Sequence, residues 1–260
     1  MAHFRKHGLP PYSVVMLHGG PGAPGGMFEV ANALSQRLGI LEPLQTGLSI
    51  TEQISELHAI VLENCTGPVK LVGHSWGAWL VYLFAACYPS LAEKLILIGA
   101  GAFNLEYNND IMKIRLSRLP EKQKSEAVIL SALVKEGKAS DSDFRRFGEL
   151  MSTADSYDSI PGKKEVQSFY PEVYNAVWAE AEKLRKSGEL LDLGSKIICP
   201  VTAIHGNYDP HPSSGVKEPL QKVLHNFKFV LLEKCGHYPW KERYARDDFY
   251  SILEKELGSG

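Results

Sequence analysis

The sequence predicts an α/β protein with a mostly parallel sheet flanked by helices and interrupted by a helical insertion. Short apolar runs alternate with amphipathic segments over the first hundred residues or so, a pattern typical of strands joined by helices. Between residues 103 and 196 the chain becomes helical and more charged, and the strand pattern returns from residue 197. We therefore expect an α/β core of residues 1–102 and 197–260, with a helical cap of residues 103–196 inserted in it.

The first half of the expected core alternates strands and helices. One helix, "SITEQISELHAIVLEN", opens with Ser49 and Glu52 at capping-box spacing. Another, "WGAWLVYLFAACYP", is apolar on nearly every side, so we expect it to be buried. A further helix is expected in "MFEVANALSQRL". The expected strands are "SVVMLHGG", a short run near "ILEPL", "PVKLVG" and "KLILIGAG".

The insertion and the last part of the chain follow in the same way. The helix "PEVYNAVWAEAEKLRKSG" has proline in its first turn and glycine at its end. The other expected cap helices are "DIMKIRLSRL", "EKQKSEAVILSALVKEG" and "SDFRRFGELMSTAD". Two strands, "KIICPVTAIHG" and "KFVLLEKCGH", and a helix, "ERYARDDFYSILEKEL", then complete the core.

Composition excludes several classes of function. The chain has 260 residues, 44% of them hydrophobic, and a formal net charge of −2, which is ordinary for one large globular domain. Its basic residues form no stripe that would bind nucleic acid, and no apolar run is long enough to span a membrane. The four cysteines form no CxxC pair, and no signal-peptide pattern follows the N-terminus. We expect a cytoplasmic protein with reduced cysteines that acts on a small molecule.

The stretch "KLVGHSWGAWLVYL" places Ser75 between Gly73 and Gly77, after an expected strand and before the buried helix. A serine within an apolar run has three interpretations: a nucleophile, a tight structural turn, or the floor of a binding pocket. The order strand, G-x-S-x-G, helix favours a nucleophile elbow, in which a strained backbone lifts the hydroxyl clear of the sheet. Ser75 is therefore the predicted nucleophile.

A serine hydroxyl needs a base to take its proton, and the base needs a carboxylate to fix its tautomer. His237 follows the last expected strand and is the predicted base; the alternative is a surface histidine on a loop. Asp209 follows the penultimate expected strand and is the predicted acid; the alternative is an aspartate in a turn. His74 adjoins Ser75, but we expect its side chain to point away along the turn. The chain order serine, acid, histidine fits a nucleophile elbow.

Hydrolysis also needs donors for the oxygen on which negative charge develops. The backbone N–H of Trp76, at the start of the buried helix, is one candidate. The loop "LHGGPG" supplies the other, and Gly20 is the predicted donor because Pro21 has no N–H. A phosphate-binding loop is disfavoured, since no lysine followed by serine or threonine closes this glycine-rich stretch.

These stretches resemble the α/β-hydrolase superfamily, and "HGGPG" with "GHSWGA" is similar to its proline iminopeptidase-like branch. The resemblance implies an eight-stranded, mostly parallel sheet, a helical cap over the active site, and hydrolysis by a serine triad without cofactor or metal. It implies that the residues named above are the nucleophile, acid, base and oxyanion donors. The chain carries "ILEPLQTGLSI" where that branch usually has DxRGxGxS, and its N-terminus is short for two full leading strands.

The expected cap carries candidate specificity residues. Tyr170, Tyr174 and Trp178 recur four residues apart, so they either line a substrate pocket or form the core of the cap. A proline iminopeptidase also needs carboxylates that hold the free amine of its substrate. The candidates are Glu106, Asp155, Asp158 and Glu172.

The sequence therefore predicts a serine hydrolase that cleaves a small ester or amide through an acyl-enzyme on Ser75. One alternative is an aminopeptidase of the proline iminopeptidase type. Another alternative, from a different class, is a receptor that binds a small molecule on the same fold. The presence of Ser75, Asp209 and His237 together favours turnover, because a receptor has less need of all three.

Overall fold

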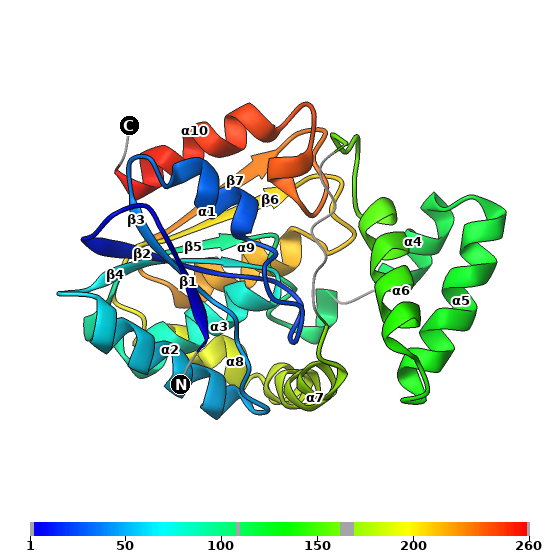
Figure 1. Ribbon diagram of the computed structural model, residues 1–260, viewed down its shortest axis with the longest axis horizontal. Helices are drawn as coiled ribbons and strands as arrows, with labels where there is room; N and C mark the ends of the chain where they lie inside the picture. Colours follow the sequence, from blue (N-terminus) through cyan, green and yellow to red (C-terminus); the bar gives the residue numbers. More distant parts are fainter. Residues whose placement is uncertain (1–2, 108–109, 162–168, 259–260) are drawn as a thin grey trace.

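The computed structural model describes residues 3–107, 110–161 and 169–258, and a seven-stranded sheet lies at its centre (Figure 1). The strand order is β1-β3-β2-β4-β5-β6-β7; β1 is antiparallel to β3 and every other neighbouring pair is parallel. The strands are β1 (Phe4–His7), β2 (Tyr12–Leu17), β3 (Gly39–Pro43), β4 (Val69–His74), β5 (Ala92–Ile98), β6 (Val201–Gly206) and β7 (Phe227–Leu232). The predicted α/β class is confirmed.

The described residues form one strand fewer than the eight that the family resemblance implies. Among the described residues, β1 is the one strand that precedes β2. The strand in "KIICPVTAIHG" also starts later than expected, at Val201, because Pro200 has no N–H for the ladder. Sequence reasoning missed β1 and also α9 (Ser214–Val223), which contains Pro219 in its interior.

Helices cover both faces of the sheet. Alternate residues of β2 point to opposite faces: Val15 and Leu17 join one buried cluster, whereas Val14 and Met16 join the other. The first cluster packs against α2 (Ile50–Asn64), α3 (Trp76–Cys87), α8 (Glu189–Asp192) and α9, and the second packs against α1 (Phe28–Leu34) and α10 (Arg246–Leu257). This is the arrangement of helices on both faces of a parallel sheet.

Two predicted helices agree with the structure in detail. Every residue of α3 from Trp76 to Ala86 is buried, as its apolar sequence predicts. Ser49 caps α2 by accepting a hydrogen bond from the N–H of Glu52. The Glu52 carboxylate accepts from the N–H of Leu48 at 2.7 Å rather than from that of Ser49, so the cap differs by one residue from the usual box.

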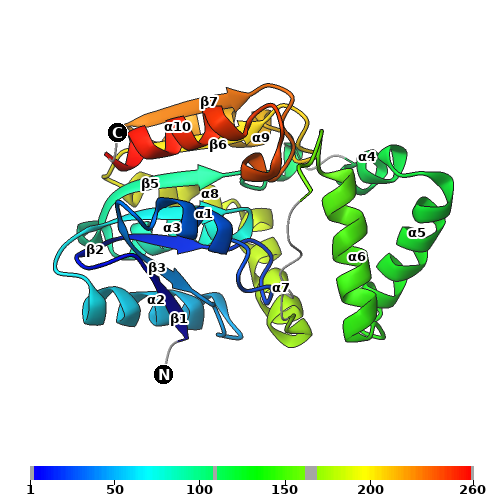
Figure 2. The same cartoon turned by 45° about the horizontal axis from the view of Figure 1, so that its top comes forward.

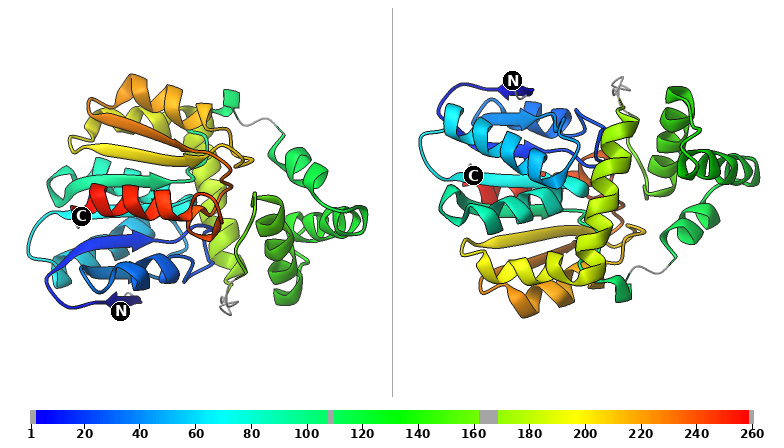
Figure 3. Two further views of the ribbon diagram at one scale, coloured as in Figure 1. Left: turned by 90° about the horizontal axis from the view of Figure 1, so that it is seen from above. Right: turned by 90° about the horizontal axis from the view of Figure 1, so that it is seen from below.

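The chain between β5 and β6 forms the four helices expected there, α4 (Ile111–Arg118), α5 (Glu121–Lys135), α6 (Asp141–Ala154) and α7 (Pro171–Ser187), and also the short α8, which was not expected. The first three pack on one another around a small cluster of their own, and Figure 2 shows them as a group set apart from the sheet. By contrast, α7 crosses the ends of the strands (Figure 3), and its Val173, Val177 and Ala181 belong to the main core. The inserted region thus has an outer group, α4 to α6, and an inner helix, α7.

All four cysteines are free thiols. Among the described residues, no helix is both long enough and apolar enough to cross a bilayer.

Candidate active site

Ser75 lies at the sharp turn that joins β4 to α3. Its backbone has φ 53° and ψ −114°, a region that residues with a side chain rarely occupy. The Ser75 N–H donates to the carbonyl of Ile98 at the end of β5, at 2.9 Å, which helps to hold the turn in this conformation. The backbone is therefore strained in the way that the G-x-S-x-G pattern predicts.

The two glycines of the motif are required by close packing. A Cβ atom on Gly73 would collide with the backbone oxygen of Gly77, and a Cβ atom on Gly77 would collide with the backbone oxygen of Leu17 at the end of β2. Strand β4, helix α3 and strand β2 therefore meet at this turn with no room for a side chain. This close approach explains why glycine stands on both sides of Ser75.

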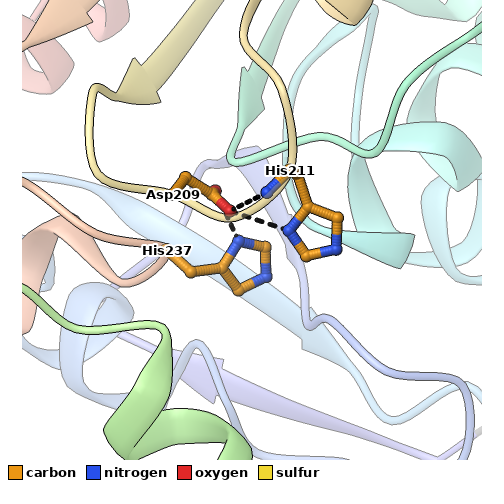
Figure 4. Close-up of side chains that lie close together, drawn as sticks. All are labelled: Asp209, His211 and His237. Carbon is orange, nitrogen blue, oxygen red and sulfur yellow. Dashed lines mark hydrogen bonds and ion pairs between the residues drawn. The ribbon is translucent and has the colours of Figure 1, made fainter. Parts of the chain in front are cut away.

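Asp209 and His237 come together at the ends of β6 and β7 (Figure 4). Oδ2 of Asp209 lies 2.6 Å from Nδ1 of His237, and the Asp209 carboxylate has no exposed surface. Burial opposes the charged imidazolium, but the charge and hydrogen bond of Asp209 outweigh it and raise the pKa of His237 above its usual value. The structure thus joins the predicted acid to the predicted base, as a triad requires.

Sequence reasoning missed two histidines that also face Asp209. Oδ1 of Asp209 lies 2.9 Å from the backbone N and 2.7 Å from Nδ1 of His211, and Nε2 of His205 lies 3.6 Å from Oδ2. Burial would raise the pKa of Asp209, but the charges of His237, His211 and His205 hold it well below its usual value. His211 could have been predicted from the sequence, because it follows Asp209 by two residues in the same loop.

These side chains also form the one group among the described residues whose spacing would suit a metal ion. One ligand atom from each of Asp209, His211 and His237 lies within 4.8 Å of the others. The carboxylate oxygens are already hydrogen-bonded to the two imidazoles, as Figure 4 shows. These hydrogen bonds between the carboxylate and the two imidazoles are enough to explain why the three side chains lie close together.

Ser75 is linked to the base through its neighbour. Nε2 of His74 donates to the carbonyl oxygen of His237 at 2.9 Å, so the elbow and the histidine loop are joined directly. The structure records no hydrogen bond between Ser75 Oγ and His237 within the described residues. Such catalytic hydrogen bonds are often long before substrate binds.

The loop that carries Gly20 lies close to the turn, because a Cβ atom on the adjacent Gly19 would lie 2.8 Å from Cβ of Ser75. The N–H of Gly20 and the N–H of Trp76, at the first position of α3, make no backbone hydrogen bond in the part of the chain that the structure describes. The Trp76 side chain is anchored separately, because its indole N–H donates to Oε1 of Gln53 at 3.0 Å. Backbone N–H groups without such bonds are what an oxyanion hole needs, so Gly20 and Trp76 stay the predicted donors.

The model of the alpha/beta hydrolase family matches residues 14–248. The chain belongs to the alpha/beta hydrolase family. Its relatives include a proline iminopeptidase of Lactobacillus helveticus, 25% identical over 95% of this chain and 90% of that protein. The human monoacylglycerol lipase ABHD6 is 27% identical over 75% of this chain.

The chain spans only 58% of the length of the monoacylglycerol lipase. Among solved structures it is similar to VinJ, with a TM-score of 0.70 and 18% identity over 98% of this chain and 94% of that one. A thioesterase domain from the curacin biosynthetic pathway is also similar, with a TM-score of 0.63 and 18% identity over 98% of this chain and 94% of that one. At these identities the two structures establish the fold alone, which they share with this chain.

The aromatic stripe of α7 divides between two environments. Tyr174 stacks on Trp178 with ring centroids 6.4 Å apart, and Trp178 stacks on Trp79 of α3 at 5.9 Å. Tyr170 does not join this stack: it lies before the first turn of α7, 40% exposed, and its N–H donates to the carbonyl of Gly22 at 2.7 Å. The stack ties α7 to the core, and the Tyr170 contact ties it to the glycine-rich loop.

The four carboxylates proposed from sequence also differ in their surroundings. Asp155 is buried and accepts two hydrogen bonds from Arg115, at 2.7 and 2.6 Å. Asp158 pairs with Arg243 at 3.2 Å. Glu106 and Glu172 are exposed. Asp155 also contacts the base through its backbone, because its carbonyl oxygen accepts from the N–H of His237 at 2.9 Å.

Proposed function

We propose that this protein is a serine hydrolase that cleaves a small ester or amide through an acyl-enzyme on Ser75. The observation that carries the proposal is the strained elbow at Ser75 next to the buried Asp209–His237 pair. Oγ of Ser75 attacks the acyl carbonyl, and Nε2 of His237 takes its proton and passes it to the leaving alcohol or amine. Water then attacks the acyl-enzyme with His237 as base again, which releases the acid and regenerates Ser75.

The remaining predicted residues support each step. Asp209 keeps the Nδ1 proton of His237 in place, so that Nε2 faces the serine as an acceptor. The N–H groups of Gly20 and Trp76 stabilise the oxyanion, and one such donor is typically worth about 3 kcal/mol in the transition state. None of these steps draws on a metal or cofactor.

We further propose that residues 103–196 act as a cap over a small-molecule pocket. The position of α7 across the strand ends supports this assignment (Figure 3). Tyr174 and Trp178 are the pocket candidates from the stripe, and Tyr170 is a candidate at its outer rim. Free thiols at all four cysteines are compatible with the cytoplasmic location that we propose.

A fluorophosphonate probe tests the nucleophile. We expect mass spectrometry to find the adduct on Ser75, and Ser75→Ala to lose both labelling and ester turnover. Ser90→Ala, at an exposed serine beyond the far end of α3, is the matched control and should keep both. An adduct on another residue, or full turnover by Ser75→Ala, would contradict the proposal. Binding of a small molecule without turnover in wild type would favour the receptor alternative.

A proline iminopeptidase-type aminopeptidase is the second candidate. The observation in its favour is the relative of that name, which aligns with 95% of this chain and is itself covered to 90%. Such an enzyme must anchor the free amine of its substrate. Asp155, whose backbone oxygen bonds the N–H of the base, already has its charge balanced by Arg115, which favours the esterase.

A further inference from the structure

Glu242 is a buried carboxylate outside the predicted triad. It follows the short 3-10 helix η4 (Pro239–Lys241) in the loop after β7, and it has no exposed surface. Its two oxygens accept three backbone hydrogen bonds, from Gly236 at 3.0 Å and from Tyr157 and Asp158 at 2.8 Å each. Burying a carboxylate is costly, so one aimed at three backbone donors marks a place where two segments are held together.

The two segments are the histidine loop, residues 236–243, and the segment 155–160 that follows α6. Backbone hydrogen bonds join them on both sides of Glu242. The N–H of His237 donates to Asp155 at 2.9 Å, that of Ile160 to Lys241 at 2.7 Å, and that of Arg243 to Asp158 at 3.0 Å. Ser159 and Glu242 form an isolated antiparallel bridge. The inserted region is therefore attached to the loop that carries the base.

The attachment is tightest directly beside His237. A Cβ atom on Gly236 would collide with the backbone oxygen of Asp155 and would lie 2.6 Å from Oε1 of Glu242. Only glycine therefore allows the histidine loop to approach segment 155–160 this closely. Asp155 is in turn held from α4 by its two hydrogen bonds with Arg115.

His237 is thus held at three points that come from three parts of the chain. Its ring meets Asp209 in the loop after β6, its carbonyl accepts from His74 at the elbow, and its N–H donates to Asp155 in the inserted region. Glu242 bonds the N–H of Gly236 and the segment that begins at Asp155. Glu242 therefore stabilises the contact between the N–H of His237 and Asp155.

We propose that Glu242 is a positioning residue that fixes His237 by tying its loop to segment 155–160, so that the inserted region is part of the support of the base. This inference rests on the proposed function, because it takes His237 as the base. A general base must be held within a fraction of an ångström, and misplacement by about 1 Å can cost on the order of a hundredfold in rate.

The test compares two buried carboxylates. Glu242→Gln keeps the size of the side chain but turns an amide NH₂ toward backbone N–H groups. Glu256→Gln is the matched control: Glu256 is 8% exposed and pairs with Lys94 at 2.5 Å and Lys228 at 2.6 Å, where α10 packs on the beginnings of the strands. We expect both variants to lower Tm. We expect only Glu242→Gln to lower kcat for an ester, by about tenfold with KM little changed.

Proton NMR adds a signal that does not depend on turnover, the Nδ1 proton that His237 shares with Asp209. We expect this signal in wild type, in Glu256→Gln and in Ser75→Ala, and its loss or shift in Glu242→Gln. If Glu242→Gln does not fold, Glu242→Asp takes its place. This variant keeps the charge but is one methylene shorter, and it should shift the same signal relative to wild type.

The outcomes separate the two proposals. If Glu242→Gln lowers Tm but leaves kcat, KM and the NMR signal unchanged, the positioning role is overturned. An NMR signal that responds to Glu242 in a protein without Ser75-dependent turnover would leave the positioning role standing and would reject the proposed function.

Discussion

His74 and His237 are joined by a hydrogen bond from Nε2 of His74 to the backbone oxygen of His237, 2.9 Å long, with ring centroids 4.7 Å apart. The side chain of His74 therefore points to the histidine loop, and its Nε2 is engaged in this hydrogen bond rather than free to act as a second base. Burial, together with the charge of His237, holds the pKa of His74 well below its usual value. A neutral His74 carries one ring proton, and this contact places it on Nε2.

Replacing His74 tests this link. His74→Phe removes the donor and leaves the carbonyl of His237 buried without it, which should cost about 1–3 kcal/mol of unfolding free energy. We also expect ester kcat to fall about tenfold, because the base loses one of its supports. Urea unfolding and steady-state kinetics measure the two effects, with His74→Gln, which can donate at a similar place, as the rescue variant. Wild-type stability and rate in His74→Phe would show that the contact is dispensable.

The pH profile of the enzyme should reflect the state of His237. The base must be neutral to accept the serine proton, and its pKa lies above 6.5, because Asp209 more than offsets the lowering effect of burial. We therefore expect kcat/KM for an ester to rise with pH and to reach half its maximum above pH 6.5. A profile that is half-maximal well below that pH would show that another group is the base.

Asp209→Asn should combine a rate loss with a shift of that profile. Without the carboxylate the tautomer of His237 is no longer fixed, and turnover should fall by on the order of a thousandfold or more. The remaining activity should reach half its maximum at a lower pH than in wild type, since burial then acts on His237 without the opposing charge. Near-normal turnover in a folded Asp209→Asn protein would place the acid elsewhere.

The Arg115–Asp155 pair should matter more for stability than the nearby Arg243–Asp158 pair. The side chains of Arg115 and Asp155 are 18% and 2% exposed, whereas those of Arg243 and Asp158 are 52% and 37% exposed. Arg115→Met leaves a buried carboxylate without its cation, and we expect a loss of about 3–5 kcal/mol. Arg243→Met, the control, should cost less than about 1 kcal/mol. Equal losses in chemical denaturation would contradict this ranking.

Substrate preference separates the two candidate functions. We expect p-nitrophenyl acetate or butyrate to be cleaved, and proline β-naphthylamide to be cut slowly or not at all. An ester needs a nucleophile, a base and an oxyanion hole, whereas the amide also needs proton transfer to a poor leaving group and an anchor for its ammonium. Side-by-side kcat/KM values decide the matter, and a naphthylamide rate equal to the butyrate rate would favour the aminopeptidase.

Local sequence determined the α/β class and the elbow. The period of the apolar residues predicted strands β2 to β7, although β6 begins later than expected, and the all-apolar run predicted the buried helix α3. The glycines beside Ser75 predicted its turn, because close approach of two backbones leaves no room for a Cβ atom. The loops after β6 and β7 could be named as carriers of Asp209 and His237 because parallel strands end at one edge of the sheet.

The tertiary structure alone decided how the base is supported. The helices α4 to α7 were predicted from their patterns, but nothing local indicates that Glu242 bonds Tyr157 and Asp158, or that Asp155 holds the N–H of His237. These contacts join residues that are distant in the sequence, through backbone groups that every residue possesses. Sequence patterns report which side chains are apolar and where a turn is forced, whereas the partner of a buried carboxylate is fixed only when the chain has folded.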